Sequence, residues 1–192
     1  MMRSSRTLAL SSLAITATLA LALGSQAAWA DHHGAASTDA AMIHADVLGA
    51  DGKSLGMVMV QQTPAGVLIT ADIKGLPAGD HGFHFHQKGL CDPAQKFTTA
   101  GDHFAGKGKQ HGLMVMGGPH GGDMPNQHVG ADGVLKAQVL NTGVTLGKGV
   151  NSLLDADGTA LVIHGNADDY TSQPAGNAGP RIACAVIAAP KS

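Results

Sequence analysis

Glutamate is absent from this chain of 192 residues, and all fourteen acidic side chains are aspartates. Arginine is scarce, because Arg181 is the only arginine that follows Arg6. Aromatic residues make up only 3% of the chain, and its single tryptophan is Trp29. No stretch repeats apolar residues with a convincing helical period. A predominantly helical protein is therefore not expected.

The apolar stretch near the amino terminus has the features of an export signal. Arg3 and Arg6 precede an apolar run from Leu8 to Leu23, and Ala28-Trp29-Ala30 has a small-x-small cleavage pattern. Residues 1–30 are therefore predicted to be a secretory signal peptide. A membrane anchor is the alternative, but the run is short, contains Ser and Thr, and is not followed by a stop-transfer pattern. We expect a periplasmic protein with no membrane segment after cleavage.

Cleavage would leave ten basic residues against fourteen acidic ones. This acidic balance argues against a nucleic-acid partner. Cysteine is also scarce, since Cys91 and Cys184 are the only two. In an exported chain such a pair predicts one disulfide, whereas two free thiols or a thiolate metal site are the alternatives. The two cysteines lie too far apart in the sequence to resemble a compact ligand pair.

Short segments of alternating polarity indicate an all-β domain over residues 42–192, preceded by a flexible lead-in at 31–41. In one of them Val67, Ile69 and Ile73 share a face, opposite Thr70 and Asp72. Such strands, separated by turn signals, are typical of a β-sandwich or barrel. We expect strands at 42–48, 55–61, 67–73, 81–87, 134–140, 142–146, 160–163 and 182–187. Residues 88–127 and 170–180 have no period, and a loop as long as the first is usually functional.

Histidines gather around this long loop. His84 and His86 are two residues apart in a predicted strand, so both rings point to one face. Imidazole is a ligand that suits copper and zinc. Within the loop lie three histidines and a carboxylate, a set typical of tetrahedral zinc: His103, His111, His120 and Asp123. We interpret these residues and the distant His164 as one two-metal site. Structural histidines or a solvated His/Gly-rich loop would not explain the strand pair together with His164.

Several motifs in this stretch and beyond it resemble the copper/zinc superoxide dismutases in their exported bacterial form. These motifs are G-F-H-F-H-Q, A-G-D-H-F, K-Q-H-G, G-P-H-G-G-D-M-P-N, L-V-I-H-G-N-A-D-D and G-N-A-G-P-R-I-A-C-A-V-I. They follow one another in the family's order, and the resemblance covers nearly the whole chain from about Met42 onward. It implies an eight-stranded Greek-key β-barrel or sandwich with a second loop near the active site.

The resemblance also implies a role for each matching residue. Copper would be bound by His84, His86, His103 and His164, and zinc by His103, His111, His120 and Asp123. Asp168 would hydrogen-bond one copper-side and one zinc-side histidine. Arg181 would lie beside the open copper face, and Cys91 and Cys184 match the family disulfide. One copper and one zinc are implied for each subunit, and both a monomer and a homodimer stay open.

The function that follows from the resemblance is conversion of two superoxide anions to dioxygen and hydrogen peroxide by a Cu(II)/Cu(I) cycle. Zinc would be structural, and His103 would leave copper on reduction and hold a proton. The enzyme would protect the periplasm from superoxide. A periplasmic metal carrier and a copper-only dismutase are the competing hypotheses. The sequence disfavours both, because it contains the implied copper ligands, Arg181 and all four zinc ligands.

Other histidines are left over from this assignment. His128 lacks the carboxylate three residues later that accompanies His120, and His81 is expected to make a structural hydrogen bond. His44 receives no role. Cleavage after Ala30 would expose Asp31-His32-His33, whose amine, backbone nitrogens and third-position imidazole could form a square-planar site for copper(II) or nickel(II). The alternative for this segment is a disordered tail.

Overall fold

The computed structural model describes residues 41–105 and 109–191. The predicted signal peptide, nearly all of the lead-in and the predicted Asp31-His32-His33 metal site lie outside these residues. Along the described residues no helix is both long enough and apolar enough to cross a membrane.

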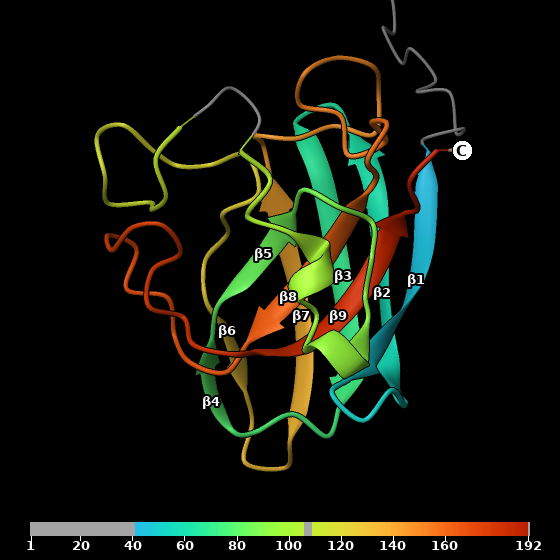
Figure 1. The fold of residues 1–192 in the computed structure, drawn as a ribbon, viewed down its shortest axis with the longest axis vertical. Coiled ribbons are helices and arrows are strands. Elements are labelled where there is room, and N and C mark those ends of the chain that lie inside the picture. Colours follow the sequence, from blue (N-terminus) through green and yellow to red (C-terminus); the bar gives the residue numbers. More distant parts are fainter. Residues whose placement is uncertain (1–40, 106–108, 192) are drawn as a thin grey trace, which may run out of the picture. The chain divides into compact units, whose positions relative to one another are not determined.

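The strands are β1 (Met42–Gly49), β2 (Ser54–Thr63), β3 (Gly66–Lys74), β4 (Gly79–His81), β5 (Phe83–His86), β6 (Gln127–Val129), β7 (Val134–Asn141), β8 (Thr159–His164) and β9 (Arg181–Ala188) (Figure 1). Two short 3₁₀ helices, η1 (Pro93–Gln95) and η2 (Thr98–Ala100), follow β5.

The strands form a curled antiparallel sheet, which confirms the all-β prediction. Seven strands are ordered β5-β8-β9-β1-β2-β3-β7, and β4 pairs separately with β6. Gly82 alone separates β4 from β5. The predicted strand at 81–87 is therefore interrupted there, and β4 with β5 counted as one strand gives the eight strands that the resemblance implies. A Cβ atom at Gly82 would lie 2.9 Å from the Ala178 Cβ and 3.0 Å from the His84 Cε1, so a side chain would not fit.

Two local predictions were wrong. The segment 142–146 is not a strand, since it has only a single bridge, between Thr145 and Ser152. The Gln62 side chain instead accepts hydrogen bonds from the Thr145 hydroxyl at 2.9 Å and from the Leu146 backbone N–H at 2.6 Å. Conversely, β6 lies at the end of the predicted loop. Three residues are too few to show a strand period, and their pairing with β4 decides the conformation.

The core lies on the concave side of the sheet. The alternation of core-facing and outward-facing side chains along the strands continues into β5. Phe83 and Phe85 are fully buried in the main hydrophobic cluster. Each such side chain contributes roughly 1.5–3 kcal/mol on burial. His84 and His86, which alternate with the two phenylalanines, are also fully buried, but they point to the other face. Packing of the two phenylalanines therefore fixes where the two imidazoles project.

A disulfide ties the loop after β5 to the last strand. Cys91 and Cys184 are bonded, as predicted, across a sequence separation of 93 residues. Cys184 is buried with Phe97, Ala100 and Val162 in a second, smaller hydrophobic cluster. The bond therefore anchors the beginning of the long loop to β9.

We expect the double substitution Cys91→Ala and Cys184→Ala to lower the free energy of unfolding by about 2–5 kcal/mol, because the unfolded chain regains the entropy of an open loop. Urea unfolding of the variant and of the oxidised parent measures this difference. The chemically reduced parent is the matched control and should unfold like the variant. Equal midpoints for the oxidised parent and the variant would contradict the prediction.

Candidate metal centre

Four imidazoles meet on the face of β5 that is directed away from the main core. His84 and His86 lie on β5, His103 follows η2, and His164 ends β8. One ring nitrogen from each lies within 4.8 Å of those of the others, and all four residues are buried. The Nε2 atoms of His86 and His164 are 3.3 Å apart. The structure thus brings together the residues predicted to form the copper group.

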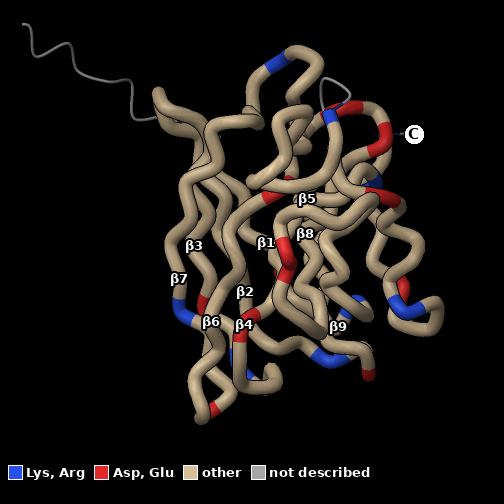
Figure 2. Tube along the Cα trace, turned by 90° about the vertical axis from the view of Figure 1, so that its left-hand side faces the viewer, with Lys and Arg blue, Asp and Glu red and all other residues tan. Residues whose placement is uncertain are grey.

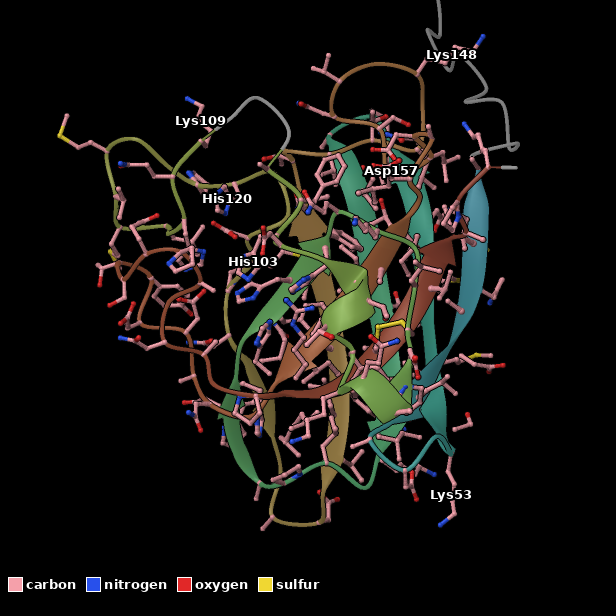
Figure 3. All side chains as sticks on the ribbon, in the orientation of Figure 1. Lys53, His103, Lys109, His120, Lys148 and Asp157 are labelled. Carbon is pink, nitrogen blue, oxygen red and sulfur yellow. A yellow bond between two sulfur atoms is a disulfide. The ribbon has the colours of Figure 1, made fainter. Side chains whose placement is uncertain are left out.

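A second group combines three imidazoles and a carboxylate: His103, His111, His120 and Asp123. One Asp123 oxygen lies 2.9 Å from His103 Nδ1, and the other lies 3.1 Å from His111 Nδ1. His120 Nδ1 is 3.4 Å from the carboxylate. Figure 3 shows His103 and His120 near each other, with Lys109 farther out along the long loop. These are the residues predicted to form the zinc group.

His103 belongs to both groups. Its Nδ1 faces Asp123, while its Nε2 is buried without a hydrogen-bond partner among the described residues. The centroid of its ring lies 4.2 Å from that of His84 and 4.8 Å from that of His86. One imidazole therefore presents a nitrogen to each of two adjoining ligand groups.

Hydrogen bonds orient the other rings. Asp168 accepts from His84 Nε2 at 2.8 Å and from His111 Nε2 at 3.0 Å, one with each carboxylate oxygen. His86 Nδ1 donates to the Gly101 carbonyl at 2.9 Å. A ring nitrogen that donates a proton leaves the lone pair on the other nitrogen, so these contacts select the tautomer. The nitrogens that are left to face a metal are then His84 Nδ1, His86 Nε2 and His111 Nδ1.

The unpaired ring nitrogens make a direct test of whether a metal fits. Buried ring nitrogens without a hydrogen-bond partner occur at His84 Nδ1, His103 Nε2, His111 Nδ1 and His120 Nδ1. Leaving a buried polar atom unpaired costs roughly 1–3 kcal/mol. All four of these ring nitrogens lie in the two groups, and bound cations would satisfy them. Imidazole donors in the first group suit copper, and three imidazoles with a carboxylate in the second suit zinc.

The charge states also favour cations. Burial lowers the pKa of His103 to about 4 and that of His164 to about 3, so both rings are neutral near pH 7. Burial also lowers the pKa of His86. Although burial raises the pKa of Asp123, the contacts of its carboxylate with His103, His111 and His120 lower the pKa by a larger amount, and the carboxylate stays ionised. His111 is the exception: burial lowers its pKa, but hydrogen bonds with Asp123 and Asp168 outweigh burial and raise it to about 9, so zinc would displace a proton from this ring. The neutral imidazoles and the buried anion are already in the ligand states that a metal cation requires.

Asp168 is itself held by residues that the sequence analysis did not single out. The Asn126 side chain donates to the Asp168 carbonyl at 2.9 Å and accepts from the Asp168 N–H at 2.8 Å. Gly176 has φ +65° and lies against the carboxylate, where an added Cβ would overlap Asp168 Oδ1. No spacing in the sequence links these positions, although Asn126 ends the G-P-H-G-G-D-M-P-N motif and Gly176 opens G-N-A-G-P-R.

Arg181 stands at the start of β9, beside the first group. Its guanidinium donates to the Phe97 carbonyl at 2.7 Å and to the Gly101 carbonyl at 2.6 Å. The second of these carbonyls also accepts from His86. Arg181 lines a pocket of about 500 Å³ together with His86, His103 and His164. A fixed positive charge therefore adjoins the open side of the histidines.

The remaining histidines that the structure describes lie outside these groups. His81 contacts the His164 carbonyl at 2.7 Å and the Pro77 carbonyl at 2.9 Å, which is the structural role expected for it. His128 is exposed and pairs with Asp80 at 2.8 Å. His44 lies on the exposed face of β1.

Comparison with known proteins gives consistent matches. Residues 54–187 match the family described as copper/zinc superoxide dismutase. The chain is 50% identical over 146 residues to superoxide dismutase [Cu-Zn] 1 of Aquifex aeolicus, covering 75% of this chain and 86% of that protein. A double mutant of a SOD-like protein from Bacillus subtilis superposes with a TM-score of 0.73 at 38% identity, over 76% of this chain and 96% of that one. For the Cu/Zn superoxide dismutase of Brucella abortus the TM-score is 0.63 at 26% identity, over 76% and 99% of the two chains.

Proposed function

The chain belongs to the copper/zinc superoxide dismutase family, and on that premise we propose that it converts superoxide to dioxygen and hydrogen peroxide with one copper and one zinc per chain. Copper would be held by His84, His86, His103 and His164, and zinc by His103, His111, His120 and Asp123. The observation that supports this proposal most is the position of His103 in both groups, with one ring nitrogen directed to each. A simple carrier of one metal has no need of such a shared ligand.

Each part of the site has a distinct task in this proposal. Bound copper supplies one-electron exchange with superoxide, and bound zinc supplies charge and fixed geometry without redox chemistry. His103 Nε2, buried beside the pocket, is positioned to hold a proton for the product. The opposite nitrogen of that ring, Nδ1, lies 2.9 Å from Asp123, and this nitrogen and the Asp123 carboxylate would both hold zinc. Asp168 fixes one ring of each group and so couples their orientations.

Arg181 would attract and orient the anionic substrate. Its guanidinium is held by two backbone carbonyls, which leaves further N–H donors in a fixed plane. Because Arg stays protonated, its charge is present throughout the working pH range. Burial lowers the pKa of His86 most, and the neighbouring His103 and Arg181 lower it further, which supports an influence of the Arg181 charge on the first group.

We expect Arg181→Ala to lower kcat/KM for superoxide by about ten- to a hundredfold while copper and zinc contents stay unchanged, because charge focusing of this kind raises association rates by 10–10³. Pulse radiolysis with metal analysis of the same samples measures both quantities. Lys53→Ala is a matched loss of one positive charge at an exposed site remote from the pocket (Figure 3). Its rate should equal that of the parent.

An unchanged kcat/KM in Arg181→Ala would show that Arg181 does not attract or orient superoxide. A metal-loaded parent without dismutase activity would overturn the proposed function and favour a metal-binding protein built on the same fold. Raising the ionic strength should slow the parent more than Arg181→Ala, because screening acts on the charge that the variant lacks.

We further propose that the protein acts in the periplasm and protects it from superoxide. The proposed signal peptide at residues 1–30, the disulfide and the bacterial relatives support export. Mass spectrometry of periplasmic protein should give a mature chain beginning at Asp31. Only that start preserves the proposed copper(II) site of Asp31-His32-His33, so any other start would exclude it.

A further inference from the structure

The outer face of the β1–β2 hairpin has a group of sulfur and imidazole side chains separate from the metal centre. We call it the His44 cluster, and its members are Met42, His44, Met57 and Met59. In the strand register His44 is directly opposite Met59, and Met57 is the next outward residue along β2. The intervening Val58 is fully buried, so the cluster is on the opposite, solvent side of the sheet.

Packing in the core does not explain these methionines. Met42 and Met57 are each 47% exposed, and Met59 is only partly buried. Solvent-facing strand positions more often carry β-branched or aromatic residues, whose shapes suit a pleated surface. Three thioethers on neighbouring positions around one histidine therefore need another explanation.

Hydrogen bonding does not explain His44 either. Among the residues that the structure describes, its ring has no hydrogen-bond or ion-pair partner. The other described histidines all make polar ring contacts: His81, His84, His86, His103, His111, His120, His128 and His164. Both ring nitrogens of His44 are thus available to a ligand from solvent.

We propose that the His44 cluster is a surface site for one copper(I) ion. Thioethers are soft ligands that favour Cu(I), and imidazole binds copper in either oxidation state. Residues directly opposite each other have Cβ atoms about 4.5–5.5 Å apart, and diagonal neighbours are about 7–8 Å apart. Methionine has three rotatable bonds and can adapt over such a span. The His44 imidazole and the Met57 and Met59 sulfurs can therefore converge on one ion, with Met42 available from the same strand as His44.

The site is independent of the two histidine groups. β1 and β2 contribute none of the grouped ligands, and the sheet order places β9 and β8 between β1 and β5 (Figure 1). Charged residues on the domain are few and lie mostly in loops (Figure 2). Two of the exceptions, Asp46 and Asp72, flank Met57 on the neighbouring strands and favour a cation there, although Lys136 offsets part of the Asp72 charge at 3.5 Å. The proposal that this site binds copper(I) does not depend on the proposed function. A role in collecting copper for catalysis does rest on the proposed function.

The test uses the mature protein with its metal centre already loaded with copper and zinc. Anaerobic titration with copper(I), in competition with a chromophoric chelator, should show one further equivalent bound per chain. X-ray absorption should detect sulfur around this copper, whereas the ligands proposed for the metal centre offer only nitrogen and oxygen. Met57→Leu with Met59→Leu should weaken the extra site at least tenfold, as should His44→Ala. Leucine has nearly the volume of methionine, so the fold should be kept.

The matched control replaces two exposed methionines elsewhere. Met114→Leu with Met116→Leu alters side chains that are 74% and 105% exposed on the long loop. This control should keep the extra copper. Loss of the copper in the control, its retention in Met57→Leu with Met59→Leu, or the absence of sulfur ligands would each overturn the proposal. Dismutase activity is measured separately, so a failure of the proposed function would not be mistaken for a failure of this site.

Discussion

A protein carrying His164→Ala is expected to keep its zinc, lose its copper and have no measurable superoxide dismutase activity. His164 belongs to the first ligand group and not to the second, so its removal leaves the proposed zinc ligands intact. Loss of residues that merely orient metal ligands lowers metal affinity by 10–100-fold, and we expect loss of a direct ligand to lower copper affinity by more than about a hundredfold. Plasma mass spectrometry after dialysis measures the metals, and pulse radiolysis measures the activity.

Two further variants separate this effect from general damage. His128→Ala removes an exposed histidine that pairs only with Asp80, and both metals and full activity should persist. His120→Ala is the reciprocal case, because His120 belongs only to the second group, and it should release zinc before copper. Stoichiometric copper with normal turnover in His164→Ala would show that the first group is not the catalytic copper site.

The placement of the strand histidines could be predicted from the sequence because it depends on a local period. Phe83 and Phe85 alternate with His84 and His86, and burial of the phenylalanines in the core directs both imidazoles to the same opposite face. The length of the segment was less predictable. The strand is interrupted at Gly82, whose backbone N–H donates to the Asn166 carbonyl and whose neighbour is the Ala178 side chain, and these contacts depend on the tertiary fold.

The loop ligands could be predicted by residue type, but their arrangement could not be derived from spacing. His111 is positioned by a side chain far along the chain, since Gln173 accepts from its backbone N–H at 3.0 Å and donates to its carbonyl at 2.8 Å. Asn126 similarly brackets the backbone of Asp168. Such contacts join loops without periodic structure, so no local sequence pattern predicts them. The same reason explains why β6 was missed, because its pairing with β4 is long-range.

Replacing Asp168 is expected to weaken both metals together. In Asp168→Ala the Nε2–H groups of His84 and His111 lose their acceptors in a buried site, and each unpaired donor costs roughly 1–3 kcal/mol. Each ring can then turn or change tautomer, which misdirects the lone pair that should face the metal. We expect zinc and copper affinities to fall by about 10–100-fold each, and activity to fall with copper occupancy.

Competition with chromophoric chelators measures both affinities, and nitrogen-15 NMR of the histidine rings reports the tautomers directly. Asp168→Asn is an informative intermediate, because its amide keeps one acceptor for one ring but turns an N–H donor toward the other. Asp157→Asn removes an exposed carboxylate in another loop and should leave both metals bound (Figure 3). If Asp168→Ala weakened only one metal, the carboxylate would orient one ring alone. If both metals were weakened, Asp168 would be a second connection between the two ligand groups, in addition to the shared ring of His103.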